Sequence, residues 1–326
     1  MKSNIAVVGC GYWGKNFVRN IYELDSLYCI CEQDIEIANS FTEKFNIPNY
    51  TFEQILADKN IVGIILAVPA QYHSEMAIKA MDSKKHVFVE KPLAMNVDEA
   101  KSMIESSKRN KVSLMVGHLL QYHPAFIKLK KLCLEGKIGK IKNIYSNRMS
   151  MGKVRSEEDV IWSFAPHDIS MILSLINNPI ETIYASGNSI IQDGISDIAS
   201  IEINFADNIK AKISVSWLHP YKEHKLTVIG EKGMMVFDDT KDWNAKLTLV
   251  DYSVEEFDKD IQLTKKESNI ITNESEPLKE ECIHFINLIN NQTINLTDGY
   301  EGLNVLKVLT EASRSLTKED IIYFKN

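Results

Sequence analysis

Three glycines near the start of the chain have the spacing of a phosphate-binding turn. Gly9, Gly11 and Gly14 lie in the stretch VVGCGYWGKN, between a short β-branched segment and a stretch with helical periodicity. Glycines at these positions allow a tight turn, close approach of the main chain to a pyrophosphate, and close packing of a helix on a strand. The N–H groups at the start of such a helix favour an anion. The stretch therefore predicts a dinucleotide site.

An acidic residue follows at the distance that such a site requires. Glu32 ends the next predicted strand, LYCICE, 18 residues after Gly14. A carboxylate at this place can accept hydrogen bonds from both ribose hydroxyls and would repel a 2′-phosphate. We therefore expect NAD rather than NADP. The alternative is a solvated glutamate at the surface.

A lysine occupies the end of another predicted strand. In HVFVEKPLA, the residues Glu90, Lys91 and Pro92 follow an apolar run, and ligands of open α/β sheets bind at the carboxyl ends of strands. A lysine near a positively charged nicotinamide can have a lowered pKa and can stabilise the alkoxide of a substrate hydroxyl during oxidation. Pro92 favours an extended conformation of Lys91. The alternative is a surface lysine without a chemical role.

The stretch IWSFAPHD, residues 161–168, supplies a candidate general base. His167 can accept a hydroxyl proton because imidazole titrates near neutrality. Asp168 follows directly, but adjacent side chains of a helix do not face each other. We therefore expect Asp168 to favour the start of a helix that runs from about His167 to Ile176. Trp162 and Phe164 are expected to pack in the interior, although Trp162 can also line a sugar site.

The elements that would position these residues change character near residue 120. The first 118 residues alternate strands with helices, which predicts a parallel sheet with right-handed crossovers. A helix is then predicted over about 124–135, followed by strands in hairpin-like succession and two closing helices. We therefore expect an α/β protein with an N-terminal Rossmann domain, residues 1–120, that binds the dinucleotide. Residues 121–326 should form a substrate-binding α/β domain with a mostly antiparallel, open sheet.

Composition excludes several classes of protein. The chain has 326 residues, enough for about two domains, and a net charge of -7, which argues against nucleic acid or an anionic membrane as the main partner. Its five cysteines contain no CxxC pair and predict thiols in a reducing compartment. No signal peptide or membrane-spanning apolar segment is present, so we expect a cytoplasmic protein. The histidines lack zinc-ligand spacing, and no metal is expected.

Four motifs in order, GCGYWG, AVPAQYH, EKPLA and VGHLLQYHPAF, resemble the Gfo/Idh/MocA oxidoreductases. The resemblance covers the whole chain and implies hydride transfer between NAD(P) and a carbinol carbon, commonly on a sugar. It implies that Lys91 is catalytic, that the segment ending in His167 completes the site, and that the open sheet makes a homo-oligomer, a dimer or tetramer. Many members carry an aspartate four residues before this histidine, where Ser163 stands here. Serine can hydrogen-bond a substrate oxygen but cannot act unaided as a base, so we expect the chemistry to rest on Lys91 and His167.

Two longer stretches resemble one branch of the family. GKVRSEEDVIWSFAPHDISMIL and SWLHPYKEHKLTVIGEKGMMVFDD are similar to enzymes that oxidise C3 of UDP-N-acetylglucosamine with NAD. That resemblance implies a UDP-sugar substrate and an aminotransferase as functional partner, together making a 2,3-diamino sugar for lipid A. Three alternatives stay open: a dehydrogenase of UDP-N-acetylglucosaminuronic acid or of another nucleotide sugar, a ketoreductase that uses NADPH, and a dinucleotide-binding regulator without catalysis. Glu32 argues against NADPH.

Two groups of residues make up the predicted site. The expected cofactor-binding residues are Gly9, Gly11, Tyr12, Trp13, Gly14, Glu32, Pro69, His73, Glu90 and Lys91. The expected substrate-binding residues are His118, Tyr122, Arg148, Lys153, Arg155, Trp162, Ser163, His167 and Lys222. The four basic side chains of the second group are candidates for the diphosphate, with arginine suited to bidentate contacts. Each is otherwise a solvated charge, and a structural role is the alternative for each histidine and for Tyr122.

Overall fold

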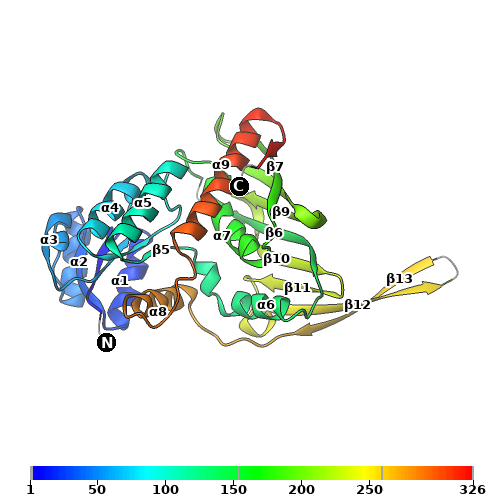
Figure 1. Cartoon of the computed structure of the whole chain (residues 1–326), viewed down its shortest axis with the longest axis horizontal. Helices are drawn as coiled ribbons and strands as arrows, with labels where there is room; N and C mark the ends of the chain where they lie inside the picture. The colour runs from blue at the N-terminus through cyan, green and yellow to red at the C-terminus, as the bar shows by residue number, and fades with distance from the viewer. Residues whose placement is uncertain (1–2, 153, 258–259, 325–326) are drawn as a thin grey trace. The chain divides into compact units, whose positions relative to one another are not determined.

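The computed structural model describes residues 3–152, 154–257 and 260–324. It divides into two compact units, each built from two segments of the chain (Figure 1). The first unit comprises Met1–Tyr122 and Glu276–Leu306, and the second comprises His123–Ser275 and Lys307–Asn326. Residues 276–306, which are predicted above to lie in the second domain, pack with the first unit in the structure. None of the described helices is long and apolar enough to cross a membrane.

The first unit contains a parallel sheet of five strands in the order β2-β1-β3-β4-β5, as expected of a Rossmann domain. Its strands are β1 (Ile5–Val8), β2 (Leu27–Cys31), β3 (Gly63–Leu66), β4 (His86–Val89) and β5 (Leu114–Val116). Its helices are α1 (Gly14–Glu23), α2 (Ile35–Phe45), α3 (Phe52–Ala57), α4 (His73–Asp82), α5 (Val97–Asn110) and α8 (Pro277–Ile289), with short 3-10 helices at Ala70–Tyr72 and Leu119–Tyr122. The strands β1, β3 and β4 are buried over nearly their whole length, which explains their continuous apolar runs.

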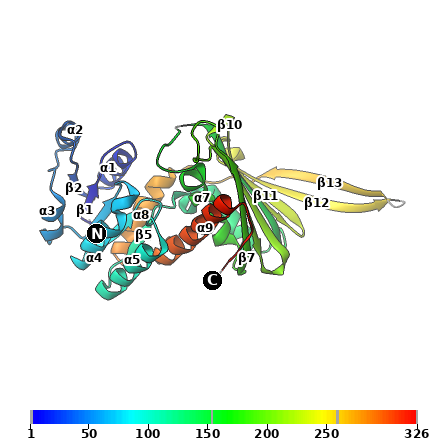
Figure 2. The same ribbon diagram turned by 90° about the horizontal axis from the view of Figure 1, so that it is seen from above.

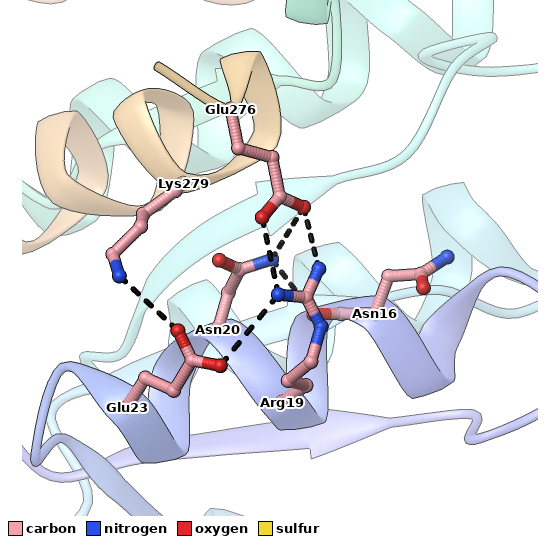
Figure 3. Close-up of polar contacts among 6 residues, drawn as sticks. All are labelled: Asn16, Arg19, Asn20, Glu23, Glu276 and Lys279. Carbon is pink, nitrogen blue, oxygen red and sulfur yellow. Dashed lines mark hydrogen bonds and ion pairs between the residues drawn. The ribbon is translucent and has the colours of Figure 1, made fainter. Parts of the chain in front are cut away.

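Helix α8 is joined to the first unit by both apolar and polar contacts. The ring of Phe285 packs edge-on against Phe88 of β4, with centroids 5.6 Å apart. At the surface, Glu276 accepts hydrogen bonds from Arg19 of α1 at 2.5 and 3.1 Å, and Lys279 lies 3.1 Å from Glu23 (Figure 3). Exposed ion pairs of this kind contribute less than about 1 kcal/mol each. The buried apolar face of α8 is therefore the main reason that it belongs to this unit.

The second unit contains a sheet of nine strands in the order β13-β12-β11-β10-β6-β9-β8-β7-β14. All neighbours pair antiparallel except β6 and β9, which confirms the expected mostly antiparallel sheet. Helix α7 packs against β6 and β9, and the later part of α9 lies on the same face of the sheet (Figure 2). The strands are β6 (Ile141–Met151), β7 (Ile180–Asn188), β8 (Ile198–Phe205), β9 (Ile209–Ser216), β10 (Leu218–Gly230), β11 (Gly233–Asp238), β12 (Leu247–Phe257), β13 (Asp260–Asn269) and β14 (Ile322–Tyr323). The helices are α6 (Pro124–Leu134), α7 (Val160–Leu175) and α9 (Gly299–Lys318), which begins in the first unit and ends in the second, with 3-10 turns at Ala206–Asn208 and Trp243–Ala245.

Candidate active site

The five strands of the first unit end in register, so the residues that follow them share one edge of the sheet. Val8 pairs with Cys31 and Leu66, and the register continues through Val89 to Val116. The hydrogen-bond ladder extends one residue further, because the N–H groups of the residues that follow β1, β3, β4 and β5 donate to carbonyls of the neighbouring strands at 2.8–3.0 Å. Those following residues are Gly9, Ala67, Glu90 and Gly117, joined by Glu32 after β2. The glycine turn, the acidic residue and the lysine segment therefore meet at a single edge.

Two of the three glycines in the turn are required by the protein's own packing. Gly9 has a φ of +86°, and a Cβ there would lie 2.6 Å from the carbonyl oxygen of Ala67. A Cβ on Gly14, where α1 begins, would lie 1.9 Å from the carbonyl oxygen of Gly9. The Cβ position of Gly11 has no atom within 4 Å. Gly11 is therefore not needed for packing within the chain, and its open side leaves the space that a pyrophosphate would fill.

A cavity of about 740 Å³ opens beside this turn. Its lining residues include Gly9, Gly11, Cys31, Glu32, Asn49, Pro69 and Tyr72. The Glu32 carboxylate is fixed by three main-chain donors: Cys10 at 2.7 Å, Gln33 at 2.8 Å and Asp34 at 3.0 Å. These bonds tie the acid to both the glycine turn and the segment after β2. A cavity of this size with a fixed carboxylate in its wall fits the adenosine ribose of NAD.

The Glu90–Lys91 segment is fixed at its first residue. One oxygen of the Glu90 carboxylate accepts a hydrogen bond from the Trp13 indole, and the other accepts one from the Lys91 main-chain N–H at 3.0 Å. Gly117 lies against the same carboxylate, since a Cβ there would be 3.2 Å from both oxygens. Burial raises the pKa of Glu90, while the Trp13 hydrogen bond and the Lys91 charge oppose this rise. The main chain at the half-buried Lys91 is therefore anchored to the glycine turn through the hydrogen bond between Trp13 and Glu90.

In the second unit, α7 carries the residues of the IWSFAPHD stretch. The helix begins at Val160, capped by Asp159, whose carboxylate accepts from the N–H groups of Ile161 at 2.9 Å and Trp162 at 3.1 Å. The predicted start near His167 was wrong: the helix begins seven residues earlier, and Pro166 lies inside it. An aspartate immediately before an apolar run is a helix-start signal, and Asp159 provided it.

Asp168 is therefore not a helix-start residue but lies in the third turn of α7. Its carboxylate is 1% exposed and accepts hydrogen bonds from Ser146 Oγ and Arg148 Nε of β6, both at 2.5 Å. Arg148 Nη1 also lies 3.4 Å from Nδ1 of His224. Burial and the Arg148 charge lower the pKa of His224 to about 4, so this ring is neutral at pH 7. The carboxylate holds α7, and with it His167, against β6.

Comparison with known proteins places these features in one family. Residues 3–118 match the oxidoreductase family with an NAD-binding Rossmann fold, named Gfo/Idh/MocA, and residues 126–236 match the C-terminal domain of the same family. Together the matches span more than half of the chain. The chain belongs to the Gfo/Idh/MocA oxidoreductase family. Its first unit is accordingly an NAD-binding Rossmann domain.

Several Gfo/Idh/MocA proteins are similar over most of the chain. The myo-inositol 2-dehydrogenase of Thermotoga maritima is 26% identical over 259 residues, which are 75% of this chain and 78% of that protein. The UDP-N-acetylglucosamine 3-dehydrogenase GnnA of Acidithiobacillus ferrooxidans has a TM-score of 0.86 at 19% identity, covering 98% of this chain and 99% of the other. The WlbA dehydrogenase of Bordetella pertussis, solved with NADH and UDP-GlcNAcA, has a TM-score of 0.80 at 22% identity, with 100% of both chains covered. The structural likenesses establish the fold.

Three residues that the sequence placed at the cofactor or substrate of this family member are buried in the first unit. His73 is 1% exposed and touches main-chain carbonyls through both ring nitrogens. His118 is 2% exposed, and its Nδ1 lies 2.6 Å from a carboxylate oxygen of Glu301. The Tyr122 hydroxyl lies 2.9 Å from Thr297 Oγ1. Tyr12, in contrast, is 88% exposed beside the glycine turn.

The predicted substrate residues of the second unit have partners of several kinds. The Trp162 indole donates to Ser313 Oγ at 2.8 Å, and Ser163 is buried. Arg155 Nε lies 3.1 Å from Glu158, and Lys222 is exposed. Lys153 lies outside the described residues. The Arg148–Asp168 pair could not be predicted from the sequence, because 20 residues separate its members and no local pattern links them.

The remaining histidines of interest have structural contacts. His123 caps α6 by accepting from the Ala125 N–H at 3.1 Å, and its Nε2 lies 3.3 Å from Asp239. His219 Nδ1 lies 2.7 Å from the carbonyl of Tyr221. Across the part of the chain that the structure describes, no group of three or more His, Cys, Asp or Glu side chains could hold a metal ion.

Proposed function

We propose that this oxidoreductase uses NAD to oxidise the C3 hydroxyl of a UDP-sugar, with UDP-N-acetylglucosamine as the first candidate. The observation that carries the proposal is the shared sheet edge, where the Glu32-lined cavity and the anchored Glu90–Lys91 segment occur together. Glu32 favours NAD because its carboxylate would repel a 2′-phosphate. The choice of sugar follows the names of the two nucleotide-sugar dehydrogenases of the same fold.

In the proposed reaction, bound NAD supplies the acceptor for the hydride that leaves C3. The Lys91 ammonium donates a hydrogen bond to the substrate oxygen and stabilises the negative charge that develops there. His167 accepts the proton of the C3 hydroxyl, so that the carbon–oxygen double bond forms as the hydride departs. Ser163 hydrogen-bonds a substrate oxygen and takes no proton. The 3-keto product suits an aminotransferase, and the open sheet suits a dimer or tetramer of this chain.

One observation favours a second candidate, the oxidation of a polyol or of a sugar without a nucleotide. Arg148 and Arg155 were candidates for the diphosphate, yet they are paired with Asp168 and Glu158. A relative that is 26% identical over 259 residues is named as a myo-inositol 2-dehydrogenase. A small neutral substrate needs no cation for a diphosphate.

The experiment measures NADH formation by the purified protein with NAD and one substrate at a time. The panel contains UDP-N-acetylglucosamine, its uronic acid, and myo-inositol, and mass spectrometry after borodeuteride reduction locates the ketone. An aminotransferase with its amino donor is added in parallel to remove a ketone whose formation is unfavourable. Turnover of UDP-N-acetylglucosamine with deuterium at C3 supports the proposal. Turnover of myo-inositol alone supports the second candidate, and NAD binding without any turnover supports a regulator.

Two variants test the assigned roles. Lys91→Ala should still bind NAD and lose turnover by about 10²- to 10⁴-fold, the usual size of an acid–base or electrostatic contribution. His167→Asn should behave in the same way. Lys59→Ala removes an exposed lysine of the same unit and should retain full activity. Near-normal turnover of His167→Asn with unchanged NAD affinity would show that another group takes the proton.

A further inference from the structure

His73, the first residue of α4, lies between two of the loops at the sheet edge. Its Nε2 is 2.9 Å from the carbonyl oxygen of Val68, and its Nδ1 is 2.8 Å from the carbonyl oxygen of Pro92. Val68 follows β3 and lines the cofactor cavity. Pro92 directly follows Lys91. A single ring that is 1% exposed therefore touches both the wall of the cavity and the segment that carries the lysine.

Both atoms that the ring touches are hydrogen-bond acceptors, so the imidazole must be the donor in any hydrogen bond with them. A carbonyl oxygen cannot donate, so each contact is a hydrogen bond only when the facing ring nitrogen carries a proton. A neutral imidazole has one N–H and serves one carbonyl, whereas the protonated ring serves both. Burial lowers the pKa of His73 although the two carbonyls oppose this, so at neutral pH the ring carries one N–H, donates it to one carbonyl and packs against the other. An apolar side chain of similar shape would fill the space but would bind neither loop.

The contacts of His73 complement those of Glu90 on the other side of the lysine. Glu90, the residue before Lys91, is anchored through the Trp13 indole to the glycine turn. The carbonyl of Pro92, the residue after Lys91, lies 2.8 Å from one nitrogen of the His73 ring, whose other nitrogen lies 2.9 Å from the Val68 carbonyl, so the ring packs between the two loops and hydrogen-bonds one of them. Each anchor reaches from the lysine segment to an element that also builds the cofactor site. The main chain is thus held at both neighbours of Lys91.

We propose that His73 is a positioning residue. Its ring ties the Lys91–Pro92 segment to the wall of the cofactor cavity and thereby fixes the main-chain position from which the Lys91 side chain extends. The sequence predicts that His73 borders the cofactor, and the burial of the ring favours this indirect role instead. The importance of the tie for turnover rests on the proposed function of Lys91. The effects of this contact on the reactivity of Lys91 and on NAD affinity can be measured without a substrate.

The test compares His73→Phe, which keeps a ring but has no donor, with His73→Gln, whose amide can donate to one loop. His86→Gln is the matched control, because His86 is a half-buried histidine of the same unit, at the start of β4, whose Nδ1 accepts from the Ser113 N–H at 3.1 Å. Each protein is labelled with isotopic acetic anhydride, and mass spectrometry gives the labelling rate of Lys91 relative to the exposed Lys59. NAD affinity is measured by calorimetry, and thermal unfolding reports folding.

His73→Phe should change the relative labelling of Lys91 by about 3-fold or more and weaken NAD binding, with His73→Gln between it and the wild type. Where a substrate is known, kcat should fall by about 10- to 100-fold, because misplacement by ~1 Å has effects of this size. His86→Gln should lower thermal stability and leave Lys91 labelling, NAD affinity and kcat unchanged.

A folded His73→Phe with wild-type labelling of Lys91 and wild-type NAD affinity would overturn the proposal. If that variant does not fold, ¹⁵N spectra of the wild-type imidazole decide, with His73→Gln for assignment. A ring N–H protected from solvent exchange is expected, and exchange as fast as that of free histidine would refute the tie. Altered labelling without turnover on any substrate would support the tie while refuting the proposed function.

Discussion

Glu281 of α8 should destabilise the folded chain at neutral pH, and replacing it by glutamine should raise stability. Its side chain is 0% exposed, and neither carboxylate oxygen has a hydrogen-bond partner among the described residues. Burial raises the pKa of Glu281 well above its usual value, and the charges of Glu90 and Glu301 act in the same direction. The folded state therefore holds a proton on this carboxyl at pH values where the unfolded chain has lost it.

The sign and size of the effect follow from proton linkage. A carboxyl whose pKa is raised on folding contributes stability that is fully present below its unfolded pKa, near 4.5, and is lost as pH rises toward the folded pKa. The loss is up to about 1.4 kcal/mol for each pH unit in that window. Glu281→Gln keeps the size and polarity of the group but cannot ionise. At pH 8 the variant should be more stable by about 1–3 kcal/mol, the loss that one to two pH units of this window produce and that the amide avoids.

The assay is urea unfolding of both proteins at several pH values from 4 to 8, without NAD. The stability difference should be near zero at pH 4 and should grow with pH until the folded carboxyl ionises. Glu43→Gln makes the same chemical change on an exposed face of α2 and should give a difference within about 0.5 kcal/mol at every pH. A variant that is less stable than the wild type at pH 8, or a difference independent of pH, would show that Glu281 has a compensating partner and would refute the reasoning.

Three other substitutions test the site. Asp168→Asn leaves the mostly buried Arg148 guanidinium, whose side chain is 12% exposed, without its counter-charge and should lower the unfolding free energy in urea by about 2–4 kcal/mol, somewhat less than for a fully buried pair. Gly9→Ala places a Cβ 2.6 Å from the Ala67 carbonyl at a φ of +86°, so calorimetry should show NAD binding weakened by about 10-fold or more. Glu32→Ala removes the ribose acceptor and the repulsion of a 2′-phosphate, so the measured ratio of NAD to NADP affinity should fall by at least about 10-fold.

The Rossmann unit could be predicted from sequence because its signals are local. The glycine turn, the strand that precedes it and Glu32 lie within a single βαβ unit, and their spacing is dictated by the turn itself. The position of α8 could not be predicted in the same way. Its apolar residues, among them Cys282 and Phe285, show that one face is buried. Periodicity does not specify which sheet that face covers, and more than 180 residues separate Phe285 from its partner Phe88.

The second unit shows where local rules conflict. The Asp159 cap and the apolar run after it predict a helix from Val160, whereas Pro166 predicts a boundary. Packing of the surrounding apolar residues favours a helix that continues through Pro166. Asp168 therefore lies in the interior of the helix and not at its start. Once there, the carboxylate must be paired, and Arg148 of the adjacent strand supplies the charge. The sequence contains both residues but not the contact between α7 and β6 that joins them.

The two units therefore determine different properties of the enzyme that we propose. Lys91 and the cofactor cavity are built from main chain at one sheet edge, where glycine conformation, Glu32 and His73 fix the geometry whatever the substrate. In the second unit, Arg148 and Arg155 each have an acidic partner, so a diphosphate must compete with Asp168 or Glu158 for them. That competition weakens the binding of a nucleotide sugar and does not affect the binding of a neutral polyol. Selectivity among sugars should consequently depend on these ion pairs, whereas changes at the sheet edge should alter the rate for every substrate alike.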